Sequence, residues 1–122
     1  MDEVHRLALQ RPNKTATPKE RRTITYQGSE AVRVYVLRRA NGICEGCGSK
    51  APFVTKKRRP YLEPHHIRRR ADGGPDDPRW VGAICPNCHK EIHYGENGIT
   101  VNAVLADYVK DREKELERQA TE

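Results

Sequence analysis

Two Cys-x-x-Cys pairs constrain this chain more than any other feature. The first pair lies in Cys44-Glu45-Gly46-Cys47 and the second in Cys85-Pro86-Asn87-Cys88. Two intervening residues let both sulfurs of a pair reach one ion, and four thiolates suit a closed tetrahedral zinc site. Zinc would close the long loop between the pairs and contribute folding free energy. The alternative is two redox-active or free-thiol pairs, but paired motifs of this kind are typical of zinc sites.

The composition indicates why such a chain needs a metal to fold. Of 122 residues, 35% are hydrophobic and 33% are charged, with one Phe, one Trp and one Met. A chain of this kind forms one small domain with a limited apolar core, which usually needs a disulfide, a metal or a partner. The N-terminus is charged and has no apolar run of a signal peptide, and no stretch is long enough to span a membrane. We therefore expect an intracellular, cytoplasmic protein whose cysteines remain available as ligands.

The positive charge is clustered. The net charge is +6, and two basic runs bracket the pair His65-His66. A basic balance favours polyanions, nucleic acid before an anionic membrane surface, although a basic run can also be a solvated surface. The candidate phosphate contacts are Lys56, Lys57, Arg58, Arg59, Arg68, Arg69, Arg70 and Arg79.

The N-terminal part of the chain divides into an arm and a helix. Residues 1–28 have no sustained apolar period, so we expect a basic flexible arm or linker there and a domain over residues 29–122. His5 lies in this arm and is expected to be an uninvolved surface residue. A helix is expected from the N-cap candidate Ser29 to Asn41-Gly42, with Val32, Val36 and Ala40 on its packing face.

The rest of the chain predicts an α+β domain. Residues 61–67 predict a short strand, and residues 80–84 are compatible with a second strand or a helical lead-in, with Trp80 as a core anchor. Pro86 suits the first turn of a helix that continues to Tyr94 and stops at Gly95. A longer helix is expected over 101–119, and a coiled-coil dimer is an open alternative. Its residues with helical spacing are Val101, Val104, Leu105, Tyr108, Arg112 and Leu116.

Histidines predict a second metal site. His89 and His93 lie four residues apart on one helix face, and His89 directly follows Cys88, so the zinc would fix where this face points. With His65, they give three imidazoles and an open position, which is the pattern of a catalytic metal. Neighbouring strand residues point to opposite faces, so His65 and His66 cannot both bind one ion in regular extended geometry. The other is available as a general base near pH 7. Scattered histidines and a mixed Cys/His structural site are the alternatives.

The segment LEPHHIRRRADGGPDDPRWVGAICPNCHKEIH resembles the HNH nuclease motif, also called ββα-metal or His-Me finger, in its form with a four-cysteine zinc. The match runs from about Cys44 to His93. The resemblance implies a two-stranded hairpin and a helix that hold one divalent ion. It implies that His65, His89 and His93 are the ligands and that His66 activates water. One departure is the middle Asn of the motif, which braces the loop bearing the base and would fall near Trp80; Asn87 is not its equivalent.

The resemblance also implies a biological setting. The flanks, including EAVRVYVLRRANGICEGCG, are similar to nuclease domains of modification-dependent restriction enzymes, which are often fused to a reader of modified cytosine. We therefore predict a metal-dependent DNA endonuclease of a restriction or defence system, with His66 as general base; a homodimer is an open alternative to a monomer. Three nitrogen ligands suit Zn, Ni, Co or Mn better than Mg. The alternatives are a non-catalytic, zinc-stabilised nucleic-acid-binding module, an interaction domain of a larger restriction complex, and RNA as the substrate.

Overall fold

Helices surround a two-stranded sheet in the computed structural model, which describes residues 2–9, 15, 17–69 and 76–121. Strands β1 and β2 pair in antiparallel fashion, with His65 opposite Gly82 and His66 opposite Val81. This mixed architecture confirms the expected α+β class. Among the described helices, none combines the length and apolarity needed to cross a membrane. In chain order the elements are α1 (Asp2–Leu9), α2 (Pro18–Ala40), β1 (Glu63–His66), the 3-10 helix η2 (Pro78–Trp80), β2 (Val81–Ile84), α3 (Pro86–Tyr94) and α4 (Gly98–Thr121).

Helix α2 begins at Pro18, so the expected start at Ser29 is wrong. Thr17 caps the helix through a reciprocal pair of hydrogen bonds with Glu20, each of 3.1 Å. This capping box, with Pro at the first helical position, is a local signal that outweighs the weak apolar period of the segment. The end of the helix is confirmed, since Asn41 takes the left-handed conformation there. Helical residues therefore lie on both sides of residue 28, and the division of the chain at that point stays a prediction.

Helix α1 packs against α2 and is part of the core. Ala8 is fully buried, and the ring of His5 stacks on that of Tyr35 with centroids 4.8 Å apart. The expectation that His5 is an uninvolved surface residue is therefore wrong. The spacing of Val4, Leu7 and Ala8 is that of one helix face, which explains how this short segment docks.

The core lies between α2, the sheet and α4. The predicted packing face of α2, namely Val32, Val36 and Ala40, is buried. Leu105 and Val109 are the buried apolar residues of α4, whereas Val104 and Tyr108 are exposed, contrary to the expected pattern. Trp80 is 40% exposed, so the expectation of a core anchor is wrong. It ends η2 instead, and β2 begins at the next residue.

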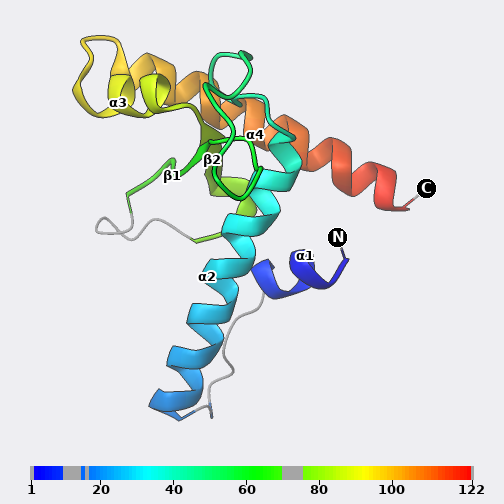
Figure 1. Ribbon diagram of the computed structural model, residues 1–122. Coiled ribbons are helices and arrows are strands. Elements are labelled where there is room, and N and C mark those ends of the chain that lie inside the picture. Colours follow the sequence, from blue (N-terminus) through cyan, green and yellow to red (C-terminus); the bar gives the residue numbers. More distant parts are fainter. Residues whose placement is uncertain (1, 10–14, 16, 70–75, 122) are drawn as a thin grey trace.

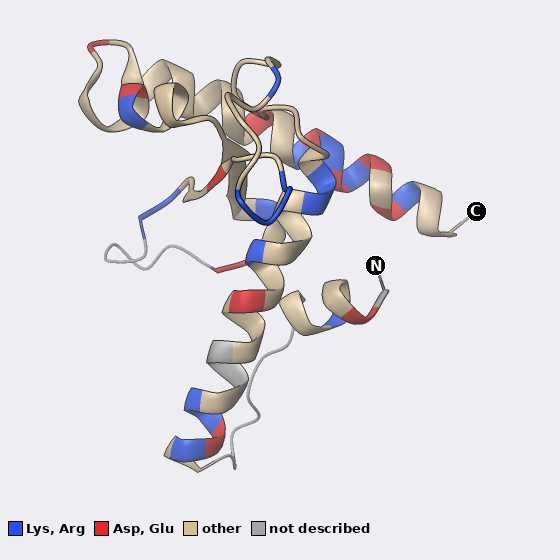
Figure 2. Cartoon of the chain, viewed as in Figure 1, with Lys and Arg blue, Asp and Glu red and all other residues tan. Residues whose placement is uncertain are grey.

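A long loop joins α2 to β1. Two isolated bridges hold it, one between Ile43 and Lys50 and one between Val54 and Pro60. Its basic tip is visible as a blue segment in Figure 2. Phe53 is 53% exposed and stacks on Tyr61 with ring centroids 4.7 Å apart. The two bridges and the Phe53–Tyr61 stack therefore hold the loop in a defined shape, with its basic residues exposed.

Candidate metal centres

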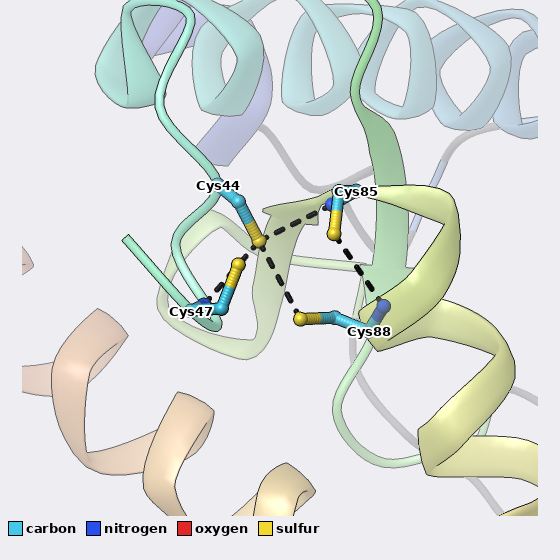
Figure 3. A group of neighbouring side chains, drawn as sticks. All are labelled: Cys44, Cys47, Cys85 and Cys88. Atoms are coloured by element: carbon cyan, nitrogen blue, oxygen red, sulfur yellow. Dashed lines mark hydrogen bonds between the residues drawn. The ribbon is translucent and has the colours of Figure 1, made fainter. Parts of the chain in front are cut away.

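The four cysteines converge although they come from two distant segments. Their Sγ atoms all lie within 4.8 Å of one another, and Figure 3 shows the side chains pointing toward a common centre. The Sγ atoms of Cys44 and Cys88 are 3.7 Å apart. A tetrahedron with Zn–S bonds of about 2.3 Å has edges of about 3.8 Å, so this spacing fits zinc. No disulfide links these four residues, all of which lie in the described chain. The donor set therefore fits a structural Zn²⁺.

Backbone N–H groups point at these sulfurs. The amides of Gly46, Cys47 and Cys85 lie 3.3, 3.4 and 3.2 Å from Sγ of Cys44. Such donors stabilise a thiolate, which is the form that binds a metal. Burial raises the pKa of the Cys85 and Cys88 thiols, so a bound cation is what would hold them as thiolates.

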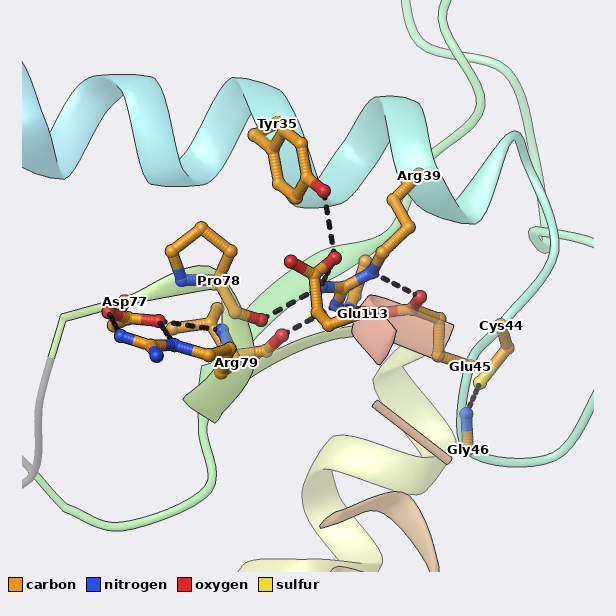
Figure 4. Close-up of polar contacts among 11 residues, drawn as sticks. Tyr35, Arg39, Cys44, Glu45, Gly46, Asp77, Pro78, Arg79 and Glu113 are labelled. Carbon is orange, nitrogen blue, oxygen red and sulfur yellow. Dashed lines mark hydrogen bonds and ion pairs between the residues drawn. The ribbon is translucent and has the colours of Figure 1, made fainter. Parts of the chain in front are cut away.

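Glu45, between the first two cysteines, joins this centre to the core. Its Oε1 accepts a 2.9 Å hydrogen bond from the amide of Ala83 in β2. Both carboxylate oxygens accept hydrogen bonds from Arg39 of α2, at 2.7 and 2.8 Å. Arg39 also contacts Glu113 of α4, as Figure 4 shows. One buried cluster therefore ties the first cysteine loop to α2, β2 and α4.

His65, His89 and His93 form a second convergent group. Each offers a ring nitrogen, and these atoms lie within 4.8 Å of one another. Their ring centroids are 5.0 to 5.4 Å apart. His65 is buried, His89 is intermediate and His93 is exposed, so the group opens toward solvent on one side. Three nitrogens with an open side fit a divalent ion that keeps a position for water or substrate.

Neighbouring side chains define which ring nitrogen is available in two of the three histidines, His65 and His89. Nδ1 of His89 lies 2.8 Å from Oε1 of Glu63, and Nε2 of His65 lies 2.9 Å from Oδ1 of Asn102. Both oxygens are acceptors, so each of these nitrogens carries the proton and the opposite ring nitrogen carries the lone pair. Tyr61 donates in turn to Glu63. Burial lowers the pKa of His65, which favours the neutral ring that a metal requires.

His66 points to a different environment from His65. Its Nε2 lies 3.0 Å from Oδ1 of Asp76, whose Oδ2 accepts a hydrogen bond from Ser29 of α2. A carboxylate only accepts, so Nε2 carries the proton and Nδ1 is left with a lone pair. His66 also lines a pocket of about 320 Å³ together with Arg33 of α2. The imidazole of His66 is therefore oriented and half-buried, and it shares a pocket with the cationic side chain of Arg33.

The candidate phosphate contacts fall into separate groups. Lys56, Lys57, Arg58, Arg59, Arg68 and Arg69 are exposed, whereas Arg70 lies outside the described residues. Arg79 is exposed but pairs with the buried carboxylate of Asp77, with Nη2 2.7 Å from Oδ2. Arg39 is buried in the ion cluster with Glu45 and Glu113. Arg33 shares the pocket of His66.

Sequence reasoning missed the residues that support the site. Glu63, Asp76 and Asn102 each hold a histidine, and they lie 26, 10 and 37 residues from their partners in sequence. No local pattern marks Asp76 or Asn102, because their partners come from other elements. At the position where the middle Asn of the motif was expected, the backbone oxygen of Trp80 accepts from the amide of Ile67 at 2.9 Å.

Three comparisons with known proteins agree with this geometry. The model of the HNH endonuclease family matches residues 44–95. The type IV methyl-directed restriction enzyme EcoKMcrA of Escherichia coli (strain K12) is 42% identical over 78 residues, or 64% of this chain. The solved structure of the type IV phosphorothioation-dependent restriction endonuclease ScoMcrA superposes with a TM-score of 0.64 and 34% identity, covering 70% of this chain. This chain spans only 28% of the first relative and 17% of the second.

Proposed function

We propose that the chain hydrolyses phosphodiester bonds of DNA, because residues 44–95 match the model of the HNH endonuclease family. The observation that carries the proposal is the side-by-side placement of a three-imidazole group and an independently oriented fourth imidazole. A module that only binds nucleic acid would need the cysteines and the basic residues, but not these four histidines. The restriction enzymes to which the chain is similar support DNA as the substrate.

His66 is the general base of the proposed reaction. Its Nδ1 carries the lone pair, because Nε2 is committed to Asp76. Nδ1 accepts a proton from a water molecule, which then attacks the phosphorus in line with the leaving 3′ oxygen. Asp76 holds the ring in one orientation and stabilises the imidazolium formed by proton transfer. Ser29 fixes Asp76 in turn.

His65, His89 and His93 are the residues that would hold the catalytic ion. A divalent cation there supplies Lewis-acid stabilisation of the negative charge on the phosphoryl and leaving oxygens. The three residues present nitrogen ligands, which suit Mn, Co, Ni or Zn better than Mg. Glu63 and Asn102 fix the rings of His89 and His65, so the ligand set is organised before substrate arrives.

Basic residues bring the DNA backbone to this centre. Arg33 shares a pocket with His66, which makes it the best placed arginine for the scissile phosphate. The exposed loop tip from Lys56 to Arg59 contacts flanking phosphates in this proposal, as do Arg68, Arg69 and Arg70. Arg79 is the weakest candidate, because Asp77 already occupies its guanidinium. These contacts give affinity without reading the sequence of bases.

The biological setting is a bacterial restriction system that acts in the cytoplasm on modified DNA. The support is the similarity to two type IV restriction enzymes, both several times longer than the matched segment. In this proposal a modified-base reader, fused or separate, selects the DNA, while residues 44–95 cut it. Pairing of two nuclease domains would then give a double-strand break.

Plasmid cleavage by a His66→Ala variant tests the proposed function. The assay uses modified and unmodified plasmid with Mn²⁺, Co²⁺, Ni²⁺ and Mg²⁺ in turn. Removal of a general base is expected to lower the rate by about 10²- to 10⁴-fold. Ion binding and the melting temperature of the variant should match those of the wild type.

His5→Ala is the matched control, because His5 lies on α1 and not among the described metal-centre residues. It should cleave at the wild-type rate. Full cleavage by His66→Ala would remove His66 as the base. Wild-type protein that binds DNA but never cuts it with any of the four ions would favour the non-catalytic binding module.

A further inference from the structure

Asn102 contacts the chain on both sides of His66. Its Oδ1 lies 2.9 Å from Nε2 of His65, and its Nδ2 donates a 2.9 Å hydrogen bond to the carbonyl of Ile67. Asn102 belongs to α4 and lies outside the segment that matches the HNH family model. A single amide therefore fixes the residue before His66 and the residue after it.

The two contacts use different halves of the amide. The carbonyl half only accepts, so it selects the form of His65 that is protonated on Nε2 and has a free lone pair on Nδ1. Acceptors of this kind orient ligating histidines and raise their basicity. The NH₂ half donates to Ile67, whose amide is held from the other side by the carbonyl of Trp80. Ile67 is thereby held at both its N–H and its C=O.

The packing of α4 explains how Asn102 reaches this position. Leu105, one turn further along the helix, lies directly over Gly82, where a Cβ atom would be only 2.8 Å from both Leu105 methyl carbons. Gly82 is the pairing partner of His65 across the sheet. Residues three apart share a helix face, so docking of Leu105 on Gly82 sets Asn102 beside His65.

We propose that Asn102 is the positioning residue that holds His65 as a metal ligand and fixes the backbone that carries His66. The proposal rests on the proposed function in one respect, namely that His65 binds the catalytic ion. It extends the functional unit beyond residue 95 to a helix that the family motif does not include.

Two substitutions of Asn102 distinguish its contact with His65 from its contact with Ile67. Asn102→Leu removes both contacts, whereas Asn102→Asp keeps an acceptor for His65 and loses the donor to Ile67. The probe is Co²⁺, titrated into protein whose cysteine site is already loaded with zinc and followed by visible absorption. The control is Gln119→Leu, which removes an exposed amide of the same helix that donates to Glu115.

Asn102→Leu is expected to weaken Co²⁺ binding by about 10- to 100-fold, the usual effect of removing such a partner. Asn102→Asp should bind Co²⁺ about as well as the wild type, although both variants should melt at a similar, lower temperature. A residue with only a structural role would affect the Co²⁺ affinity of both variants equally.

Equal loss of affinity in the two variants, or no loss in Asn102→Leu, would overturn the inference while leaving the proposed function intact. A wild-type protein that binds no Co²⁺ at the histidines would instead overturn the proposed function, and this inference with it. Gln119→Leu should bind Co²⁺ as the wild type does, and a deficit there would contradict the assignment to Asn102.

Discussion

Arg39 and Glu45 form a bidentate ion pair whose side chains are 0% and 1% exposed. The guanidinium makes five hydrogen bonds, to Glu45 twice, to Glu113, and to the carbonyls of Pro78 and Val81. An arginine has five N–H donors, so all of them are used. Because Glu45 lies between two cysteines of the four-thiol group, this pair couples the candidate metal centre to the packing of the core.

Arg39→Met should destabilise the protein by about 3–5 kcal/mol, because it leaves Glu45 and Glu113 as buried carboxylates without their cation. The free energy of unfolding is measured with denaturant in the presence of zinc. The matched control is Arg38→Met, since Arg38 is the exposed neighbour on the same helix. Equal costs for the two variants would contradict the buried cluster.

Removal of zinc should unfold the domain around the sheet. A chelator, or Cys44→Ser, is expected to lower the helical circular dichroism signal and to abolish cleavage, because the ion would join two cysteine segments that are distant in sequence. Metal content by mass spectrometry should fall by one zinc per chain. A chelated protein that keeps its fold and its activity would rule out the structural zinc.

Asp76→Ala should lower the cleavage rate by about 10²-fold, since a misplaced catalytic group commonly costs that much. The KM for DNA should change little, because the hydrogen bonds of Asp76 go to His66 and Ser29. Ser29→Ala should give a smaller loss in the same direction. An exposed carboxylate on α4 gives the control, Asp107→Ala, which should be neutral. A change confined to KM would refute this role for Asp76.

Gly82→Ala should cost about 1–3 kcal/mol of stability, because the new methyl group overlaps the Leu105 side chain. The same substitution in a Leu105→Ala background should cost much less, which a double-mutant cycle detects as a coupling energy. Additive effects would mean that α4 does not rest on Gly82.

Lys56→Ala with Lys57→Ala should weaken DNA binding equally for all sequences. Each lost phosphate contact is expected to reduce the slope of log K against log salt by about 1. Filter binding or fluorescence anisotropy over a range of salt concentrations measures this slope. A Lys110→Ala with Lys114→Ala variant, which removes two exposed lysines of α4, serves as a charge-matched control. An unchanged slope in the double variant would exclude the loop tip from the interface.

The candidate ligands come from local sequence motifs, and the structure brings the residues of each predicted group together. Cys85, Pro86 and Gly95 mark the start and stop of α3, so the helical face of His89 and His93 follows directly. The orientation of α4 was not predictable in the same way. Val104 and Tyr108 satisfy helical spacing as well as Leu105 and Val109 do, and only the close approach at Gly82 decides which stripe is buried.

The other features that the sequence did not predict are contacts between residues far apart in the chain. Asn102 is 37 residues from His65, and Glu113 is 74 from Arg39. The helical or strand periodicity of the sequence cannot link such positions, because their contacts depend on how the folded helices and strands pack against one another. The start of α2 is a different case, since Thr17, Pro18 and Glu20 carried a readable capping signal that the polar composition of the segment obscured.

Glu113 lies well downstream of the recognised nuclease motif, yet its carboxylate is shared by Tyr35 and Arg39 inside the molecule. A truncated protein that ends with the matched segment, residues 44–95, would therefore lose Glu113, which is one of the two carboxylate partners of the buried Arg39. A shortened version of the protein therefore has to include α2 from Tyr35 onward and α4 as far as Glu113, so that these hydrogen bonds are kept.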